Sequence, residues 1–196
     1  FIDRLSGIGA LSRETAIDYG LTGPILRSTG VDYDVRKAQP YLVYDQMEFE
    51  VPLGNRGDSY DRFVCRILEI EQSMRIVEQA LERMPLGPIA IDDPRIVIPD
   101  KEKVYNSIEG LMHQFKHIME GIQVPAGEVY LAVEGGNGEL GFYIVSDGGG
   151  RPYRVRVRPP CFIAMSSFHE MIKGHMVADV IPTFGMVNMI GGECDR

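Results

Sequence analysis

The chain has 196 residues, of which 44% are hydrophobic and 24% charged, a composition typical of a globular rather than a disordered protein. Its formal net charge of -8 argues against a general nucleic-acid binder, which needs a basic surface. The three cysteines show no paired spacing, which favours a reducing compartment over a disulfide framework. No apolar run is long enough to cross a bilayer and no signal peptide is evident, so we expect a chain that is soluble or peripheral to a membrane.

Residues 1–57 are predicted to be rich in loops. A short helix is expected from Ser12, which has the side chain of an N-cap, to Gly20. Between Thr22 and Tyr44 the periodicity is weak and turn-forming residues are frequent, which predicts a long ordered loop. Loops of that length in compact domains are usually functional or docked on another surface, so this region is predicted to be a docking segment. A brief strand is expected over residues 47–51.

Residues 58–120 are predicted to form two long helices that pack as an antiparallel pair. Asp58 can cap the first, about Ser59 to Met84, which a proline ends. The second is expected from about Lys101 to Glu120. Each has an apolar stripe at helical spacing. The stripes consist of Tyr60, Val64, Ile67, Met74, Val77 and Leu81 in the first helix and of Val104, Ile108, Leu111, Phe115 and Ile118 in the second.

Two histidines, His113 and His117, lie four residues apart on the second predicted helix. This spacing can place two imidazoles on one metal ion, and Glu120 lies on the same side. Both histidines fall opposite the apolar stripe, however. We therefore interpret them as solvated or interface residues and predict no metal site.

Residues 128–160 are predicted to form a small antiparallel meander of three strands, because apolar and polar residues alternate on both sides of two glycine-rich turns. The first turn, residues 135–138, lacks the Lys-Ser/Thr of a phosphate-binding loop and is interpreted as a hairpin turn. The last strand carries a row of three arginines, Arg154, Arg156 and Arg158. This row is expected either to pair with acidic residues of the sheet or to dock a partner. The acidic candidates are Glu128, Glu134 and Glu139.

Residues 161–196 are predicted to form a helical tail. One helix is expected from Ser166 or Ser167 through Ile172, and another begins over residues 175–182. Polar groups are scattered through an apolar segment, which is therefore either buried or lines an apolar pocket. The abrupt end of the sequence suggests a terminus that is tied down. No arrangement of serine, cysteine, histidine and aspartate can be argued to be catalytic from spacing. The predicted fold class is α+β.

Six runs of residues, in order along the chain, resemble the D subunit of respiratory complex I, which is similar to the large subunit of nickel-iron hydrogenases. The resemblance extends along essentially the whole chain and implies a hydrogenase-large-subunit-like fold. It also implies that the chain is only the carboxyl-terminal half of such a protein, because the half with the histidine and tyrosine thought to hold the quinone head group is missing. The runs are Thr-Gly-Pro-Ile-Leu-Arg (22–27), Arg-Lys-Ala-Gln-Pro-Tyr (36–41), Arg-Gly-Asp-Ser-Tyr-Asp-Arg (56–62), Ser-Asp-Gly with Arg-Pro-Tyr-Arg (146–154), Lys-Gly-His-Met-Val-Ala-Asp-Val (173–180) and Gly-Glu-Cys-Asp-Arg (192–196).

What the resemblance implies is a share in a proton-pumping NADH:quinone oxidoreductase. Family members lie in the peripheral arm, against the subunit that carries the terminal iron-sulfur cluster, and the two form the pocket where quinone is reduced. FMN, NADH and the iron-sulfur clusters belong to partner subunits, and membrane-arm subunits complete the complex. The expected location is peripheral, at the cytoplasmic face of the cell membrane or the matrix face of the mitochondrial inner membrane. The isolated chain is expected to bind no cofactor and to be inactive.

The resemblance places no catalytic residue in this half. It suggests that Met189, Ile190, Asp195 and Arg196 line the quinone pocket, with Asp179 in an ion-pair network beside it, and that the arginine row 154, 156 and 158 docks the neighbouring subunit.

Two alternatives remain open. One is the large subunit of a membrane-bound complex of the nickel-iron-hydrogenase type. In those enzymes the tail supplies metal-binding cysteines in a CxxC motif, whereas the matching positions here are Ile190 and Glu193, and Cys194 is one place off. A nickel site would lack soft ligands in this chain, which disfavours that alternative. The other is a non-catalytic assembly or docking module.

Overall fold

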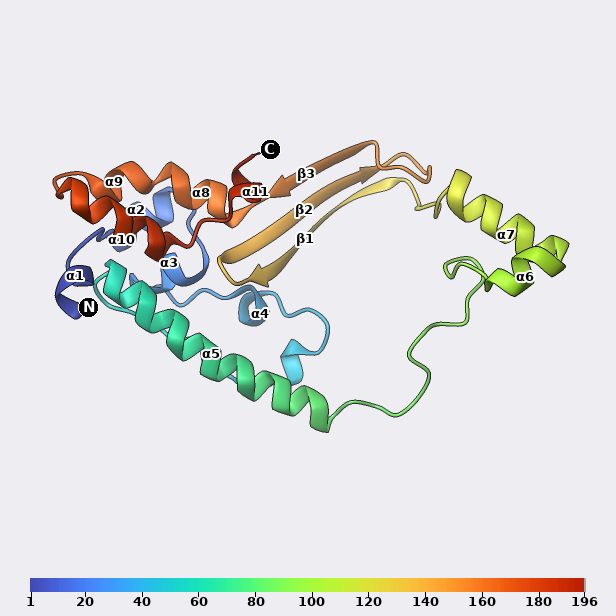
Figure 1. Ribbon diagram of the computed structural model, residues 1–196, viewed down its shortest axis with the longest axis horizontal. Coiled ribbons are helices and arrows are strands. Elements are labelled where there is room, and N and C mark those ends of the chain that lie inside the picture. Colours follow the sequence, from blue (N-terminus) through green and yellow to red (C-terminus); the bar gives the residue numbers. More distant parts are fainter. Residues whose placement is uncertain (196) are drawn as a thin grey trace. The chain divides into compact units, whose positions relative to one another are not determined.

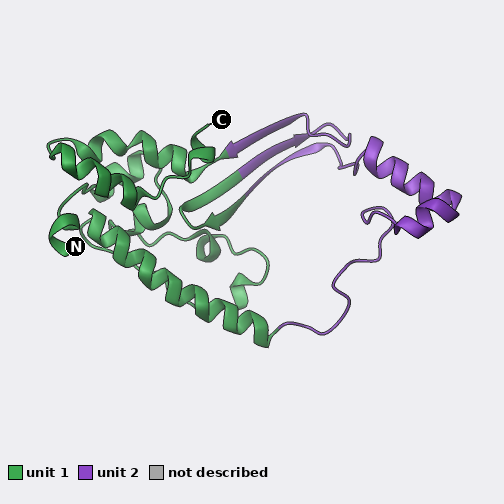
Figure 2. Ribbon diagram, viewed as in Figure 1, with its two compact units in different colours: residues 1–83, 132–141, 158–196 green, residues 84–131, 142–157 purple. Residues whose placement is uncertain are grey.

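The structure is a computed structural model that describes residues 1–195. The chain, expected to be one region, divides into two compact units. Unit 1 contains residues 1–83, 132–141 and 158–196, and unit 2 contains residues 84–131 and 142–157 (Figure 2). Helices and a three-stranded sheet occur together, so the predicted α+β class is confirmed.

The α-helices and strands are labelled in Figure 1. In chain order they are α1 (Ile2–Leu5), α2 (Arg13–Asp18), α3 (Gly23–Arg27), α4 (Val35–Ala38), the 3-10 helix η1 (Tyr44–Gln46), α5 (Ser59–Glu82), α6 (Lys101–Asn106), α7 (Ile108–Met119), β1 (Gly127–Gly135), β2 (Gly138–Ser146), β3 (Arg154–Arg158), α8 (Pro160–Ser166), α9 (Phe168–Ile172), α10 (Val177–Val187) and α11 (Gly191–Cys194). Among the described helices, none combines the length and the apolar composition that a membrane crossing requires.

The predicted helix at residues 12–20 is confirmed as α2, and the Ser12 hydroxyl accepts a hydrogen bond from the Thr15 amide at 3.1 Å. The long loop predicted after it is wrong, because α3, α4 and the start of η1 lie there. A helix of four or five residues is too short to show a 3.6-residue repeat, so periodicity does not reveal it. A local signal does exist: Asp34 caps α4, and its carboxylate accepts a hydrogen bond from the Arg36 amide at 2.9 Å.

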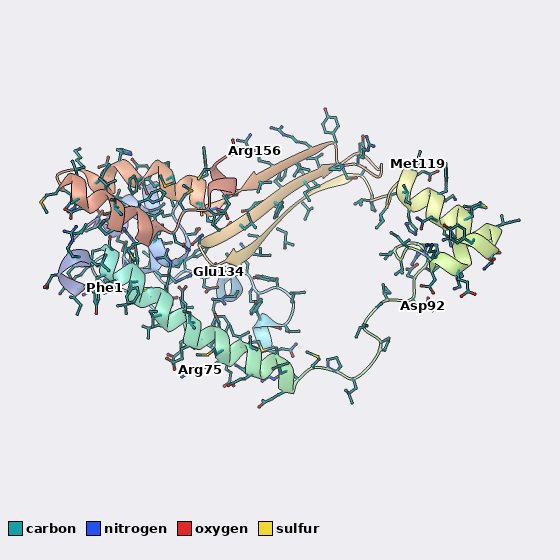
Figure 3. The ribbon with its side chains drawn as sticks, in the orientation of Figure 1. Phe1, Arg75, Asp92, Met119, Glu134 and Arg156 are labelled. Atoms are coloured by element: carbon teal, nitrogen blue, oxygen red, sulfur yellow. The ribbon has the colours of Figure 1, made fainter. Side chains whose placement is uncertain are left out.

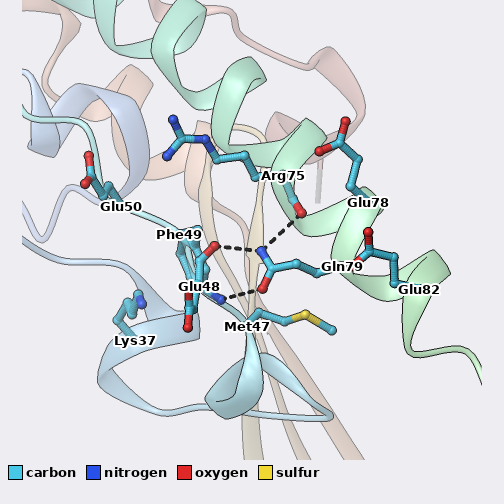
Figure 4. Close-up of a pocket in the computed structure, with 9 residues that line it drawn as sticks. All are labelled: Lys37, Met47, Glu48, Phe49, Glu50, Arg75, Glu78, Gln79 and Glu82. Atoms are coloured by element: carbon cyan, nitrogen blue, oxygen red, sulfur yellow. Dashed lines mark hydrogen bonds between the residues drawn. The ribbon is translucent and has the colours of Figure 1, made fainter.

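The brief strand predicted at residues 47–51 is not formed. The Glu48 amide donates to Gln79 Oε1 at 2.8 Å, and Gln79 Nε2 donates to the Glu48 carbonyl at 2.7 Å (Figure 4). The Glu50 amide likewise donates to Gln72 Oε1 at 3.0 Å. A glutamine amide offers the same donor and acceptor as a peptide group, so two side chains of α5 take the place of a neighbouring strand.

The long helix α5 agrees with its predicted bounds, and Asp58 caps it by accepting a hydrogen bond from the Asp61 amide at 2.8 Å. Its orientation differs from the expectation. The buried face contains Arg62, Cys65 and Gln72, whereas most of the predicted apolar stripe is exposed. The hydrophobic periodicity thus located the helix correctly but assigned the wrong face to the core.

The second predicted helix is two helices, α6 and α7. Ser107 interrupts it with extended backbone and caps α7, since its hydroxyl accepts a hydrogen bond from the Gly110 amide at 2.9 Å. Each of the predicted long helices has packing partners in its own unit: α5 packs with α1, α3 and α10, and α6 packs with α7. The antiparallel pair predicted for residues 59–84 and 101–120 would join one unit to the other, and it stays a prediction.

The three strands form an antiparallel meander in the order β1, β2, β3, as predicted. The first turn lies in unit 1, and its Asn137 and Gly138 are buried. Gly23 of α3 approaches it so closely that a Cβ atom there would lie 2.5 Å from the Gly138 Cα atom. Only glycine fits this contact, which seats the hairpin turn on α3.

The tail is helical, as predicted, but its first helix was missed. α8 begins at Pro160, which was expected only to end β3, although proline is favoured in the first turn of a helix. α9 follows Ser167, as expected. α10 continues through Pro182 to Val187. Pro182 has no amide to donate to the Ala178 carbonyl, and Arg4 Nη2 donates to that carbonyl instead at 3.4 Å.

Unit 1 has an apolar core and, beside it, a buried ionic cluster centred on Arg27. Arg27 Nε lies 2.7 Å from Glu69 Oε1 of α5, and Arg27 Nη1 lies 2.8 Å from Glu134 Oε1 of β1 and 3.7 Å from Asp34 Oδ2. Arg36 also pairs with Asp34, at 2.6 Å. The apolar core consists of Leu11, Ala16, Leu21, Ile25, Leu26, Ala164, Met171 and Val187.

Burial and charge act in opposite directions on this cluster. Burial raises the pKa of Glu134, although Arg27 opposes the rise. Burial also disfavours the ionised Asp34, but hydrogen bonds and the charges of Arg36 and Arg27 outweigh it, so the pKa of Asp34 is lowered. The arginines therefore favour the ionised form of both carboxylates, and they outweigh burial at Asp34 but not at Glu134.

Replacing Arg27 with methionine should destabilise the chain by roughly 3–5 kcal/mol, because it leaves buried carboxylates without their partner. The exposed Arg75, which pairs with Glu71 at 3.2 Å, provides a matched control (Figure 3). Arg75→Met should cost less than about 0.5 kcal/mol. Urea unfolding followed by circular dichroism measures both. The cost of R27M should shrink at acidic pH, since protonation of Glu134 removes its unpaired charge. Equal losses in the two variants would contradict this account.

Candidate functional site

The tail is anchored at one buried thiol, that of Cys161 in α8. The Cys161 amide donates to Glu193 Oε2 at 2.9 Å, and Cys161 Sγ accepts hydrogen bonds from the Ile190 amide and from Asn137 Nδ2, each at 3.4 Å. Asn188 Nδ2 donates to Asn137 Oδ1 at 2.9 Å. The residues around α11, the start of α8 and the turn between β1 and β2 therefore meet at this point in unit 1.

The Cys161 thiol is held in its neutral form. Burial raises its pKa to about 11, and the nearby Glu193 carboxylate contributes to the rise. A neutral thiol is a poor nucleophile and a poor metal ligand, since both roles need the thiolate. Its role in this arrangement is to accept hydrogen bonds that position the tail.

The four predicted pocket residues differ in how much of each is exposed. Met189 is half-buried and packs against the apolar core, whereas Ile190 is 51% exposed while its amide is bound to Cys161. Asp195 is exposed, and Arg196 lies outside the described residues. Of these residues, Ile190 is bound to the Cys161 cluster through its amide, and the lining of a pocket stays a prediction.

Asp179, which was expected in an ion-pair network with Asp195 and Arg196 beside the pocket, forms an ion pair with Arg4, whereas a pairing with Arg196 lies outside the described residues. Its carboxylate lies 3.1 Å from Arg4 Nη1 and accepts a hydrogen bond from the Met176 amide, also at 3.1 Å. It therefore caps α10 and ties that helix to α1.

The arginine row is divided between the two units. Arg158, in unit 1, donates to the carbonyls of Glu139 and Gly20 at 2.7 and 2.8 Å, so it is engaged within the chain. Arg154 and Arg156, in unit 2, are exposed (Figure 3 labels Arg156). The other two acidic candidates have partners of their own, because Glu134 pairs with Arg27 and Glu128 accepts a hydrogen bond from the Tyr143 hydroxyl. Pairing thus accounts for Arg158, and docking stays a prediction for the other two.

Two arginines of α5 were missed as structural determinants of this region. Arg62 is fully buried and donates to the carbonyls of Gly9 and Gly57 at 2.6 and 2.8 Å. Arg66 Nη1 donates to the Met186 carbonyl at 2.7 Å, at the end of α10. An arginine at the carboxyl end of a helix binds carbonyls that have no partner within the helix. The signal in the sequence was two arginines four residues apart that flank the apolar stripe.

No metal centre is formed by histidine, cysteine, aspartate or glutamate among residues 1–195. His117 Nε2 lies 2.8 Å from the Pro94 carbonyl oxygen in unit 2, which gives that imidazole a local structural partner. At the positions that match the hydrogenase cysteines, Glu193 binds the Cys161 amide through its carboxylate.

Unit 1 also has an open hollow of about 540 Å³ between α5 and residues 47–50 (Figure 4). Four glutamates line it, and Lys37 Nζ lies 4.1 Å from the centre of the Phe49 ring. None of the predicted site residues borders this hollow. Its lining consists of Lys37, Met47, Glu48, Phe49, Glu50, Arg75, Glu78, Gln79 and Glu82.

The three cysteines should differ in reactivity. Cys65 and Cys161 are each 1% exposed, and burial raises the pKa of both thiols to about 11. Cys194 is only partly buried. At pH 8 iodoacetamide should therefore modify Cys194 well before the other two, which should react only after denaturation in urea. Peptide mass spectrometry after timed quenching measures the order, and early modification of Cys161 would contradict a buried, neutral thiol at this position.

Comparison with known proteins places the chain in a family. The sequence model described as "Respiratory-chain NADH dehydrogenase, 49 Kd subunit" matches residues 1–196. An NADH-quinone oxidoreductase D subunit of Sorangium cellulosum (strain So ce56) is 63% identical, and the alignment covers 100% of this chain and 49% of the relative. The D subunits of the same enzyme from Myxococcus xanthus (strain DK1622) and Pelobacter propionicus (strain DSM 2379 / NBRC 103807 / OttBd1) are 56% and 55% identical over 100% of this chain, and 47% and 49% of their own lengths. The chain thus spans about half the length of these curated relatives, and it belongs to the family of the 49 kDa subunit of the respiratory-chain NADH dehydrogenase.

Proposed function

We propose that the chain is part of the D subunit of an NADH:quinone oxidoreductase and that its tail forms one wall of the quinone-reduction pocket. The observation that carries this proposal is the match to the family over every residue, at 63% identity to a relative named as the D subunit of an NADH-quinone oxidoreductase. The tail is included in that match. Its chemistry supports the finer part of the proposal, because half-exposed Ile190 and half-buried Met189 lie beside the polar Cys161 cluster.

In this proposal the chain forms part of the wall of the quinone pocket, and the partner subunits bind the redox groups. Iron-sulfur clusters, FMN and NADH belong to other subunits of the peripheral arm, and quinone is the substrate. The neighbouring subunit carries the terminal iron-sulfur cluster, and membrane-arm subunits complete the enzyme. The location that follows is peripheral, at the cytoplasmic face of the cell membrane or the matrix face of the mitochondrial inner membrane. The chain alone would have no redox activity.

The tail is tested by placing a charge in the proposed apolar wall. In the full-length protein within its complex, Ile190→Asp should lower NADH:quinone reductase activity about tenfold, because a charge beside an apolar ligand costs at least ~1.4 kcal/mol. Ile89, a fully exposed isoleucine of unit 2, provides the matched control Ile89→Asp, which should leave activity unchanged. Reduction of ferricyanide by NADH, which bypasses quinone, should be unaffected in both. Normal quinone reduction by a stably assembled I190D complex would exclude this wall.

The docking of the exposed arginines is tested by reversing their charge. If Arg154 and Arg156 dock the neighbouring subunit, they face acidic groups of that subunit. Arg154→Glu with Arg156→Glu would then place like charges against each other and should reduce the amount of this protein that co-purifies with the peripheral arm. Arg13→Glu, a reversal at an exposed arginine of α2, is the control. The loss should deepen when the salt concentration of the wash is lowered, because repulsion is then less screened. Full assembly of the double variant would show that these arginines dock nothing.

A further inference from the structure

Asn137 lies in the turn between β1 and β2, and its side chain contacts two separate parts of the tail. Its Nδ2 atom donates to Cys161 Sγ at 3.4 Å, and its Oδ1 atom accepts a hydrogen bond from Asn188 Nδ2 at 2.9 Å. The residue is only 7% exposed, and burying an amide is costly unless its hydrogen bonds are made. The backbone of Asn137 is not left-handed, so the turn does not need asparagine for its conformation. The position requires the side chain.

The turn that carries Asn137 is fixed against the start of α3. A Cβ atom on Gly138 would lie 2.5 Å from Thr22 Oγ1, just as one on Gly23 would collide with the turn. The Glu139 amide also donates to Thr22 Oγ1, at 3.0 Å. The two glycines therefore allow a close contact, and the hydrogen bond sets its register. Asn137 is thus a fixed point from which the tail can be held.

Asn188, which Asn137 binds, ends α10 in the left-handed conformation, with φ 56° and ψ 49°. Residues other than glycine adopt this conformation at a cost, and asparagine tolerates it better than most. Immediately before it, Arg66 Nη1 donates to the Met186 carbonyl, which holds the last turn of the helix. The bond from Asn137 then holds the side chain of Asn188. It therefore helps to set the direction in which the chain leaves α10.

Two residues further along, the same group of side chains holds the backbone. The Ile190 amide donates to Cys161 Sγ at 3.4 Å, and Ile190 has extended backbone, with φ −99° and ψ 112°. Successive side chains of an extended segment point to opposite sides. Accordingly, Met189 packs against the apolar core while Ile190 is 51% exposed. The bonds at residues 188 and 190 thus decide which of these two side chains faces outward.

We propose that Asn137 is a positioning residue for quinone reduction, which fixes residues 188–190 at the proposed quinone wall. This inference rests on the proposed function. Asn137 is buried and does not need to touch quinone, so it acts through the residues that it holds. Its loss should therefore weaken the binding of quinone, whereas the redox groups of the partner subunits stay as they are. A buried turn far from the tail in the sequence thereby acquires a part in the reaction.

The test uses the full-length protein in its purified complex and measures KM and kcat for NADH:quinone reduction with a short-chain ubiquinone. Asn137→Ala should raise KM about fivefold and leave kcat within about twofold, because a displaced wall weakens the binding of quinone and of the transition state alike. Asn106→Ala, the same change at an exposed asparagine of α6, should alter neither. Rates are divided by the ferricyanide reductase activity, so that a smaller amount of assembled complex does not lower them.

A double-mutant cycle tests whether Asn137 acts through Asn188. Asn188→Ala should also raise KM, because it removes the same hydrogen bond and leaves alanine in a left-handed conformation. The double variant should raise KM by less than the product of the two single effects, since the shared bond can be lost only once. A full product would contradict a role that passes through this bond.

A second measurement does not involve quinone. In the Asn137→Ala complex, iodoacetamide should modify Cys161 without denaturant, because the amide that covers the sulfur is gone. Modification of Cys161 with an unchanged KM would show that Asn137 holds the tail without positioning quinone; it would overturn this inference and leave the proposed function standing. Protection of Cys161 as in the unaltered complex would overturn the inference as well. An unaltered complex that fails to reduce quinone would refute the proposed function itself, and this inference with it.

Discussion

The pairing of Arg27 with three carboxylates is the interaction on which unit 1 depends. Arg27 belongs to α3, and its partners come from α5, from β1 and from the segment that begins α4. Three elements far apart in the sequence thus share one buried guanidinium. Ion pairs of this kind add little stability compared with apolar packing, but they tolerate only one arrangement of the elements. We infer that the cluster fixes where the hairpin turn, and through Asn137 the tail, lies against the rest of unit 1.

Sequence patterns predicted the positions of most helices and strands, but not which face of each one is buried. The alternation at residues 128–160 and the Asp58 cap predicted the meander and α5 nearly to the residue. The apolar stripe of α5 then misled, because a repeat of hydrophobic residues shows that a face is covered without showing what covers it. In this chain the core lies on the side of Arg62, Cys65 and Gln72. Contacts between residues far apart in the chain decide which face of a helix is buried, and a single sequence does not show these contacts.

The tail shows the same limit for function. The resemblance identified the family and suggested Met189 and Ile190 as pocket residues, but it did not indicate that Cys161 would bind the Ile190 amide. Nor did it separate Arg158, which is engaged within the chain, from the exposed Arg154 and Arg156. Alternation along a strand tells which residues share a face, whereas the number of acceptors near each guanidinium depends on the fold around it.

The composition of unit 1 from three separate stretches of chain has a consequence for biosynthesis. Residues 1–83 cannot complete their core until residues 132–141 and 158–196 have left the ribosome. At roughly 5–20 residues per second, the nascent chain waits seconds to tens of seconds with Leu26 and its neighbours uncovered. A polypeptide in that state is prone to aggregate, so this protein is a natural client for chaperones that bind nascent chains. Slow codons between residues 84 and 157 would lengthen the exposure and lower the yield of folded protein.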